Sequence, residues 1–147
     1  MEKRYSYSYI ELICTVVIAL LIFSGVIVPG IRNVTAKFNK TADILTAKNI
    51  YDSLTYGFVL DSISYPDRDT YIVLGDKNDI NSSLDKAYKY NVMSYLENSL
   101  TTYPSKTKMS KENYVVHITV DGNIEILAGT QFGSSIYPKA SGEYVTQ

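Results

Sequence analysis

The chain has 147 residues, of which 46% are hydrophobic and 20% are charged, and its formal net charge at pH 7 is -1. These values favour a single compact domain with an additional N-terminal segment. They give no basic field that would attract phosphate, so direct binding to nucleic acid is not expected.

The sequence offers little of the chemistry that enzymes need. Its single cysteine, Cys14, lies in the most apolar stretch, so no intrachain disulfide is possible and the thiol is expected to behave as a small apolar group. Its only histidine, His117, falls on the polar face of a predicted strand and is expected to be an ordinary surface or cross-strand residue. Because no glycine-rich phosphate loop, CxxC or HExxH motif occurs, neither an enzymatic activity nor a cofactor is predicted.

The most apolar part of the chain runs from Leu12 to Val28, LICTVVIALLIFSGVIV, and contains no charged residue. As a helix it would be roughly 25 Å long, close to the ~30 Å thickness of a bilayer core, which predicts a membrane-spanning helix. Cations on its two sides nearly balance, so the positive-inside rule does not fix the orientation of the segment. These cations are Lys3 and Arg4 before it and Arg32, Lys37 and Lys40 after it.

Glu11 stands at the N-terminal edge of this apolar run. A carboxylate at the centre of a membrane helix costs about 2.5–3.5 kcal/mol, and an edge position costs less because the side chain can reach water. One interpretation is an interfacial acid with no special role. The other is that a cation from a partner offsets this cost once the subunit is assembled.

The stretch from Tyr7 to Leu12, YSYIEL, follows a short basic leader and precedes an apolar run that ends at Pro29. This arrangement resembles the N-terminal signature of type IV prepilins and pseudopilins, over roughly the first third of the chain. The resemblance implies cleavage by a prepilin peptidase between Ser6 and Tyr7 and N-methylation of Tyr7. It also implies that Glu11 pairs with the N-terminal amine of a neighbouring subunit. Two departures are that Ser6 stands where the family normally has glycine, and that Pro29 comes one residue late.

The resemblance implies an α+β fold of the type IV pilin kind, in which a long N-terminal helix packs on a small antiparallel β-sheet head. Residues 1–6 would be the leader peptide, and residues 7–29 a transmembrane helix that also forms the filament core. Residues 30–147 would hold the amphipathic continuation of the helix and a globular α+β head. Pro29 and Gly30 are expected to weaken the helix near the membrane exit.

The function implied by the resemblance is that of a structural subunit of a type IV pilus or pseudopilus, serving adhesion, motility, protein secretion or DNA uptake. Its partners would be other copies of itself or other pilins, the prepilin peptidase, the inner-membrane assembly platform and the membrane. The subunit would lie in the cytoplasmic membrane as a single pass with its head outside, and in an extracellular filament at the cell surface.

Two other classes of protein fit parts of the same pattern. In a secreted soluble protein, Lys3 and Arg4 would begin a signal peptide that ends near Ala36, after Val34 and Thr35. A single-span membrane-anchored extracytoplasmic binding protein would explain the hydropathy, but it leaves YSYIEL as a coincidence.

Beyond Pro29 the apolar residues recur at spacings of three and four, which predicts an amphipathic helix that continues to Gly57 or as far as Asp61. The predicted apolar stripe contains Ile31, Val34, Phe38, Ala42, Leu45, Asn49 or Ile50, Leu54 and Phe58. The charged residues are expected to lie largely off this stripe: Lys37, Lys40, Asp43, Lys48 and Asp52.

The rest of the chain predicts a mixture of strands and one more helix. The segment Thr70–Leu74 is a strand candidate and Leu84–Leu100 carries a second helical stripe. Alternation over Tyr114–Val120, an Asp-Gly turn and a second alternating run from Ile124 predict a β-hairpin. The pair Tyr144–Val145 is a candidate edge strand.

Four acids cluster in the predicted loops, namely Asp67, Asp69, Asp76 and Asp79. Oxygen ligands of this type suit calcium, which makes them weak candidates for a calcium site. Their spacing matches no EF-hand, and the alternative is that they are solvated turn residues. No metal is therefore predicted.

Overall fold

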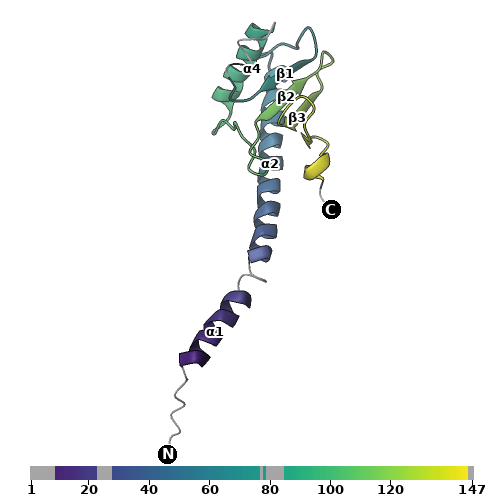
Figure 1. The fold of residues 1–147 in the computed structure, drawn as a ribbon. Coiled ribbons are helices and arrows are strands. Elements are labelled where there is room, and N and C mark those ends of the chain that lie inside the picture. Colours follow the sequence, from purple (N-terminus) through teal and green to yellow (C-terminus); the bar gives the residue numbers. More distant parts are fainter. Residues whose placement is uncertain (1–8, 23–27, 77, 79–84, 146–147) are drawn as a thin grey trace, which may run out of the picture. The chain divides into compact units, whose positions relative to one another are not determined.

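The computed structural model describes residues 9–22, 28–76, 78 and 85–145 (Figure 1). The chain divides into two compact units, one that reaches to Phe38 and one that runs from Asn39 onwards. The first unit contains helix α1 (Tyr9–Ile22) and the start of helix α2 (Val28–Val59). The second unit contains the rest of α2, helix α4 (Lys86–Ser99), the whole β-sheet and a short C-terminal 3-10 helix.

Helix α1 has 14 residues and is therefore roughly 21 Å long, short of the ~30 Å core of a bilayer. Among the described residues, no helix is both long and apolar enough to cross a membrane. The predicted pilin-type fold with one long N-terminal helix, transmembrane over residues 7–29, was therefore wrong. The predicted location, a single pass through the cytoplasmic membrane, conflicts with the same finding and was also wrong.

The finding rests on the two described helices of the N-terminal part. Helix α1 covers Tyr9–Ile22, and the residues 23–27 lie outside the described part of the chain. Helix α2 is long, with 32 residues, but it carries charged residues from Arg32 onwards. The apolar helix α1 is thus short in its described part, and the long helix α2 is charged.

In the second unit, α2 buries one stripe of side chains at helical spacing. Asp43, Ala47, Ile50 and Leu54 are fully buried and Phe58 is 7% exposed. The predicted stripe was correct from Ile50 onwards and wrong before it, because four of its apolar members are more than half exposed: Ile31, Val34, Phe38 and Leu45. A polar residue, Asp43, occupies the buried side instead.

The sheet has four antiparallel strands in the order β1 (Thr70–Val73), β2 (Tyr114–Ile118), β3 (Ile124–Ala128) and β4 (Ser135–Tyr137). Side chains alternate between its two faces. On one face Ile72 lies opposite Val116, which lies opposite Ile126, and all three are fully buried. These residues share one core with the buried stripe of α2 and with three residues of α4: Val92, Met93 and Leu96. The second unit is therefore an α+β fold with two helices and an antiparallel sheet around one core.

The predicted β2–β3 hairpin and the strand at Thr70 are confirmed. The candidate edge strand at Tyr144 was wrong, since this residue lies in the 3-10 helix η2 (Gly142–Tyr144). Its N–H donates to the carbonyl of Ser141, and its ring is fully buried. Tyr144 is therefore held by burial of its ring in the core, and not by pairing with a neighbouring strand as the sequence suggested.

Gly122 closes the β2–β3 turn in the left-handed region, with φ +81°, and its N–H donates to the carbonyl of Thr119. A Cβ at this position would lie 2.5 Å from Cε1 of Tyr65, a ring that stacks on Phe58. Gly122→Ala is therefore expected to lower the free energy of unfolding by about 1–2 kcal/mol, measured by urea denaturation. A loss no greater than that of Asn123→Ala, in the same turn, would contradict this explanation.

Candidate functional site

Helix α1 exposes large apolar side chains on every side. The residues Val16, Val17 and Ile18 are consecutive and each is about half exposed, at 51%, 49% and 56%. Because successive residues of an α-helix point about 100° apart, such runs cover the whole circumference. The other exposed large apolar residues among the described side chains of this helix are Tyr9, Leu12, Ile13, Leu20, Leu21 and Ile22. A contiguous apolar surface of this kind marks a site of interaction.

Glu11 lies in the first turn of α1 and is exposed. Its carboxylate is close to the positive end of the helix dipole, which favours an acid at this position. The predicted cleavage site, Ser6 and Tyr7, lies outside the described residues. Pro29 and Gly30 lie in the first turn of α2, where a proline removes no hydrogen bond from the helix.

The four acids considered for calcium do not assemble into a metal site in the described residues, where no group of three or more suitable side chains occurs. Asp69 accepts a hydrogen bond from the N–H of Val120 at 3.1 Å, which ties the loop to the end of β2. Asp76 accepts one from the backbone two residues further on. Asp67 is exposed, and Asp79 lies outside the described residues.

His117 makes the cross-strand contacts that its position in a strand predicted. Its ring stacks on Tyr71 with 4.1 Å between centroids, and its Nδ1 lies 3.7 Å from a carboxylate oxygen of Glu125. Both partners sit directly opposite it on β1 and β3. The histidine therefore acts as a link across three strands.

The carboxylate of Asp43 on α2 is fully buried in the second unit. Its Oδ1 accepts hydrogen bonds from the N–H of Lys108 at 2.6 Å and from the hydroxyl of Tyr114 at 2.9 Å. Its Oδ2 accepts from the N–H of Met109 at 2.9 Å and from the hydroxyl of Tyr144 at 3.5 Å. One side chain thus joins α2 to a loop, a strand and the C-terminal 3-10 helix.

This arrangement holds the two tyrosines in their neutral form. Burial raises the pKa of Tyr114, and its hydrogen bond to Asp43 and the charge of that carboxylate raise the pKa further. Burial also raises the pKa of Tyr144, with a further contribution from Asp43. This site was not predicted, because Asp43 was expected among the solvated charges and is in fact fully buried. The available signal was its spacing of four and seven residues from Ala47 and Ile50.

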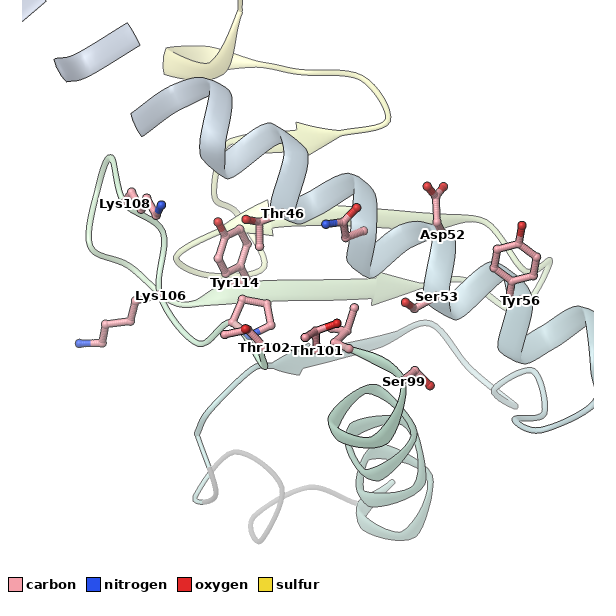
Figure 2. Close-up of a pocket in the computed structure, with 13 residues that line it drawn as sticks. Thr46, Asp52, Ser53, Tyr56, Ser99, Thr101, Thr102, Lys106, Lys108 and Tyr114 are labelled. Carbon is pink, nitrogen blue, oxygen red and sulfur yellow. The ribbon is translucent and has the colours of Figure 1, made fainter. Parts of the chain in front are cut away.

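A polar groove of about 630 Å³ lies between α2 and residues 99–108 (Figure 2). Lys106 and Lys108 stand at one end of it, and Asp52 and Tyr56 stand at the other, as Figure 2 shows. Between them the lining consists mainly of hydroxyl and amide side chains: Thr46, Asn49, Ser53, Ser99, Thr101 and Thr102. A volume of this size is typical of sites that take small molecules.

The described residues therefore present two surfaces that suit interaction, namely the apolar circumference of α1 and the polar groove of the second unit. Comparison of the chain with family models, curated proteins and solved structures found no match. The chemistry of these two surfaces and the N-terminal sequence pattern therefore indicate the function.

Proposed function

We propose that this protein is a structural subunit of a filament of the type IV pilus or pseudopilus class, and that it polymerises through helix α1. The observation that carries the proposal is the exposed apolar surface around all sides of α1. The YSYIEL pattern at Tyr7–Leu12 supports the same class. Adhesion, motility, secretion and DNA uptake are all functions of filaments of this kind.

The distribution of the apolar residues favours an open assembly over a dimer. A symmetric dimer would cover one side of α1 and would leave the opposite side in water. Valine and isoleucine at three consecutive positions, Val16, Val17 and Ile18, need neighbours in several directions. A bundle of α1 helices from successive subunits supplies these neighbours, because helices pack at interaxial distances of about 8–10 Å on any apolar side.

Glu11 has a specific place in this proposal. In a bundle of α1 helices its carboxylate would be removed from water, which is costly unless a cation accompanies it. Cleavage between Ser6 and Tyr7 creates an amine four residues before Glu11 in the same chain and available to a neighbouring one. Pairing between the amine of one subunit and the Glu11 carboxylate of the next would align successive subunits.

The test uses the chain in its native host, with Ile18→Asp as the variant. Because Ile18 is 56% exposed, we expect normal folding of the subunit but at least a tenfold loss of sedimentable filaments, since a charge in the bundle is left unpaired. Filaments are counted by immunoelectron microscopy. The matched control is Val59→Asp, a change at a 72% exposed valine outside α1, which is expected to leave filaments unchanged.

Filaments at normal levels in Ile18→Asp would overturn the proposal, and equal losses in both variants would show that the effect is not specific to α1. The N-terminus of the assembled subunit, determined by mass spectrometry, is expected to be N-methylated Tyr7. A chain that begins at Lys37 would instead identify a secreted soluble protein, because that product lacks α1 altogether.

A further inference from the structure

We propose that the groove between α2 and residues 99–108 binds an acidic saccharide, with its carboxylate at the lysine end and a sugar ring against Tyr56. The inference concerns the second unit alone and does not rest on polymerisation through α1. It depends on three features of the groove (Figure 2), which are its hydroxyl-rich floor, its basic end and its exposed aromatic ring.

The floor of the groove presents hydroxyl and amide side chains that can accept hydrogen bonds from a ligand or donate hydrogen bonds to it. The hydroxyl of Ser99 donates back to a helix carbonyl at 2.7 Å, so its oxygen lone pairs face the groove as acceptors, while the hydroxyl of Thr46 donates to a helix carbonyl at 2.8 Å and also contacts the hydroxyl of Tyr114. Asn49 and Thr101 are exposed to water, and their side chains both donate and accept. Sugar hydroxyls, which donate and accept at every carbon, match such a lining.

The basic end of the groove is held in place by the buried Asp43 carboxylate. The backbone N–H of Lys108 donates to Asp43, and in the same loop the hydroxyls of Thr107 and Ser110 lie 2.8 Å apart. The loop backbone is thus fixed at Lys108, whereas the exposed side chain of Lys106, which Figure 2 draws extending away from the other labelled residues, must turn back to reach an anion in the groove. Two ammonium groups at one end favour a carboxylate over a neutral group.

The end of the groove opposite the lysines presents the aromatic ring of Tyr56, and the charge of the nearby Asp52 is offset by an ion pair. Tyr56 is 66% exposed, so a face of the ring is available to the C–H groups of a sugar. The nearby acid, Asp52, forms an ion pair with Lys48 at 2.6 Å, which offsets its charge. An acidic ligand can therefore lie along the whole groove.

A saccharide fits this lining better than a peptide does. Peptides are usually bound through an open strand edge or through apolar pockets for alternate side chains. The groove is lined by α2 and by the segment after α4 rather than by a strand edge, and Leu100 and Pro104 are its only aliphatic lining residues among the described ones. Hydroxyl and amide groups dominate the remainder.

The experiment measures binding of a galacturonic acid trisaccharide and of the matching neutral galactose trisaccharide to the full-length chain, by calorimetry at low salt. The acidic sugar is expected to bind about tenfold more tightly, with a difference that shrinks as salt is added. Lys106→Ala combined with Lys108→Ala should remove most of this difference, whereas Tyr56→Ala should weaken both sugars.

The chain provides a matched control for each variant. Lys86 is an exposed lysine of α4, and Tyr90, at 65% exposed, matches Tyr56; neither lines the groove. Lys86→Ala and Tyr90→Ala are expected to bind both sugars as the unchanged chain does. The proposal is overturned if neither sugar binds, or if the control variants lose binding equally. Equally tight binding of a triglutamate peptide would also overturn it, and would assign the groove to acidic peptides.

Discussion

Asp43→Ala is expected to lower the free energy of unfolding by on the order of 4 kcal/mol. The change removes the acceptor of four hydrogen bonds and leaves two backbone N–H groups, those of Lys108 and Met109, without their partner. It also removes the acceptor to which the buried hydroxyls of Tyr114 and Tyr144 donate. Each buried donor that loses its partner costs about 1–3 kcal/mol, and the sum is limited by relaxation of the loop.

Urea denaturation followed by circular dichroism measures this loss. Asp43→Asn keeps one carbonyl acceptor but turns an amide donor toward another donor, so an intermediate loss of about 2 kcal/mol is expected. The control is Asp52→Ala, an exposed acid of the same helix in an i,i+4 pair with Lys48, which is expected to change stability little. If Asp43→Ala were no more harmful than Asp52→Ala, the carboxylate would not hold these elements together.

Asp43 also shows where sequence reasoning fails. A count of apolar residues assigns an aspartate to the solvated side of a helix, and this rule is right for Asp52 and for Lys48. The burial of Asp43 depends on Tyr114 and Tyr144, which are 71 and 101 residues away in sequence. No local pattern contains that information, although the spacing of Asp43 from Leu54 fits the buried stripe.

In the sheet, too, the strands with a local sequence signal could be predicted and those without one could not. The β2–β3 hairpin could be predicted because the alternation and the Asp121–Gly122 turn lie within one short stretch. Strand β4 has three residues, Ser135–Tyr137, too few to display a period of two, and its pairing is irregular between Ile126 and Leu127. The groove could not be predicted either, because its lining comes from two segments that are far apart in the sequence, α2 and residues 99–108.

In the N-terminal segment, the prediction of a membrane-spanning helix was wrong. Hydropathy over Leu12–Val28 gave a length that suits a bilayer. The described part of α1 has 14 residues, and no described helix is both long and apolar enough to cross a membrane. The apolar character of the segment was predicted correctly, and it is this character that supports assembly through α1.

Above about pH 10 the protein is expected to lose stability steeply, because its buried tyrosines must then ionise on unfolding. Burial raises the pKa of Tyr88 and the pKa of Tyr103 to about 12. Burial likewise raises the pKa of Tyr114 and the pKa of Tyr144. An unfolded tyrosine releases its proton near pH 10, while these folded tyrosines retain theirs. The stabilisation is therefore fully present below pH 10 and is lost as pH rises through each folded pKa.

Each such tyrosine lowers the free energy of unfolding by up to about 1.4 kcal/mol per pH unit, and by less for the partly buried Tyr88 and Tyr103. Since domains are stable by about 5–15 kcal/mol, unfolding is expected between about pH 11 and pH 12. Urea denaturation at a series of pH values measures the slope, and tyrosinate absorbance reports the ionisation. Tyr114→Phe should lower stability near neutral pH, because it removes a donor to Asp43, and should also flatten the alkaline slope. An unchanged slope in this variant would mean that Tyr114 ionises without unfolding, and that the Asp43 site opens to water on its own.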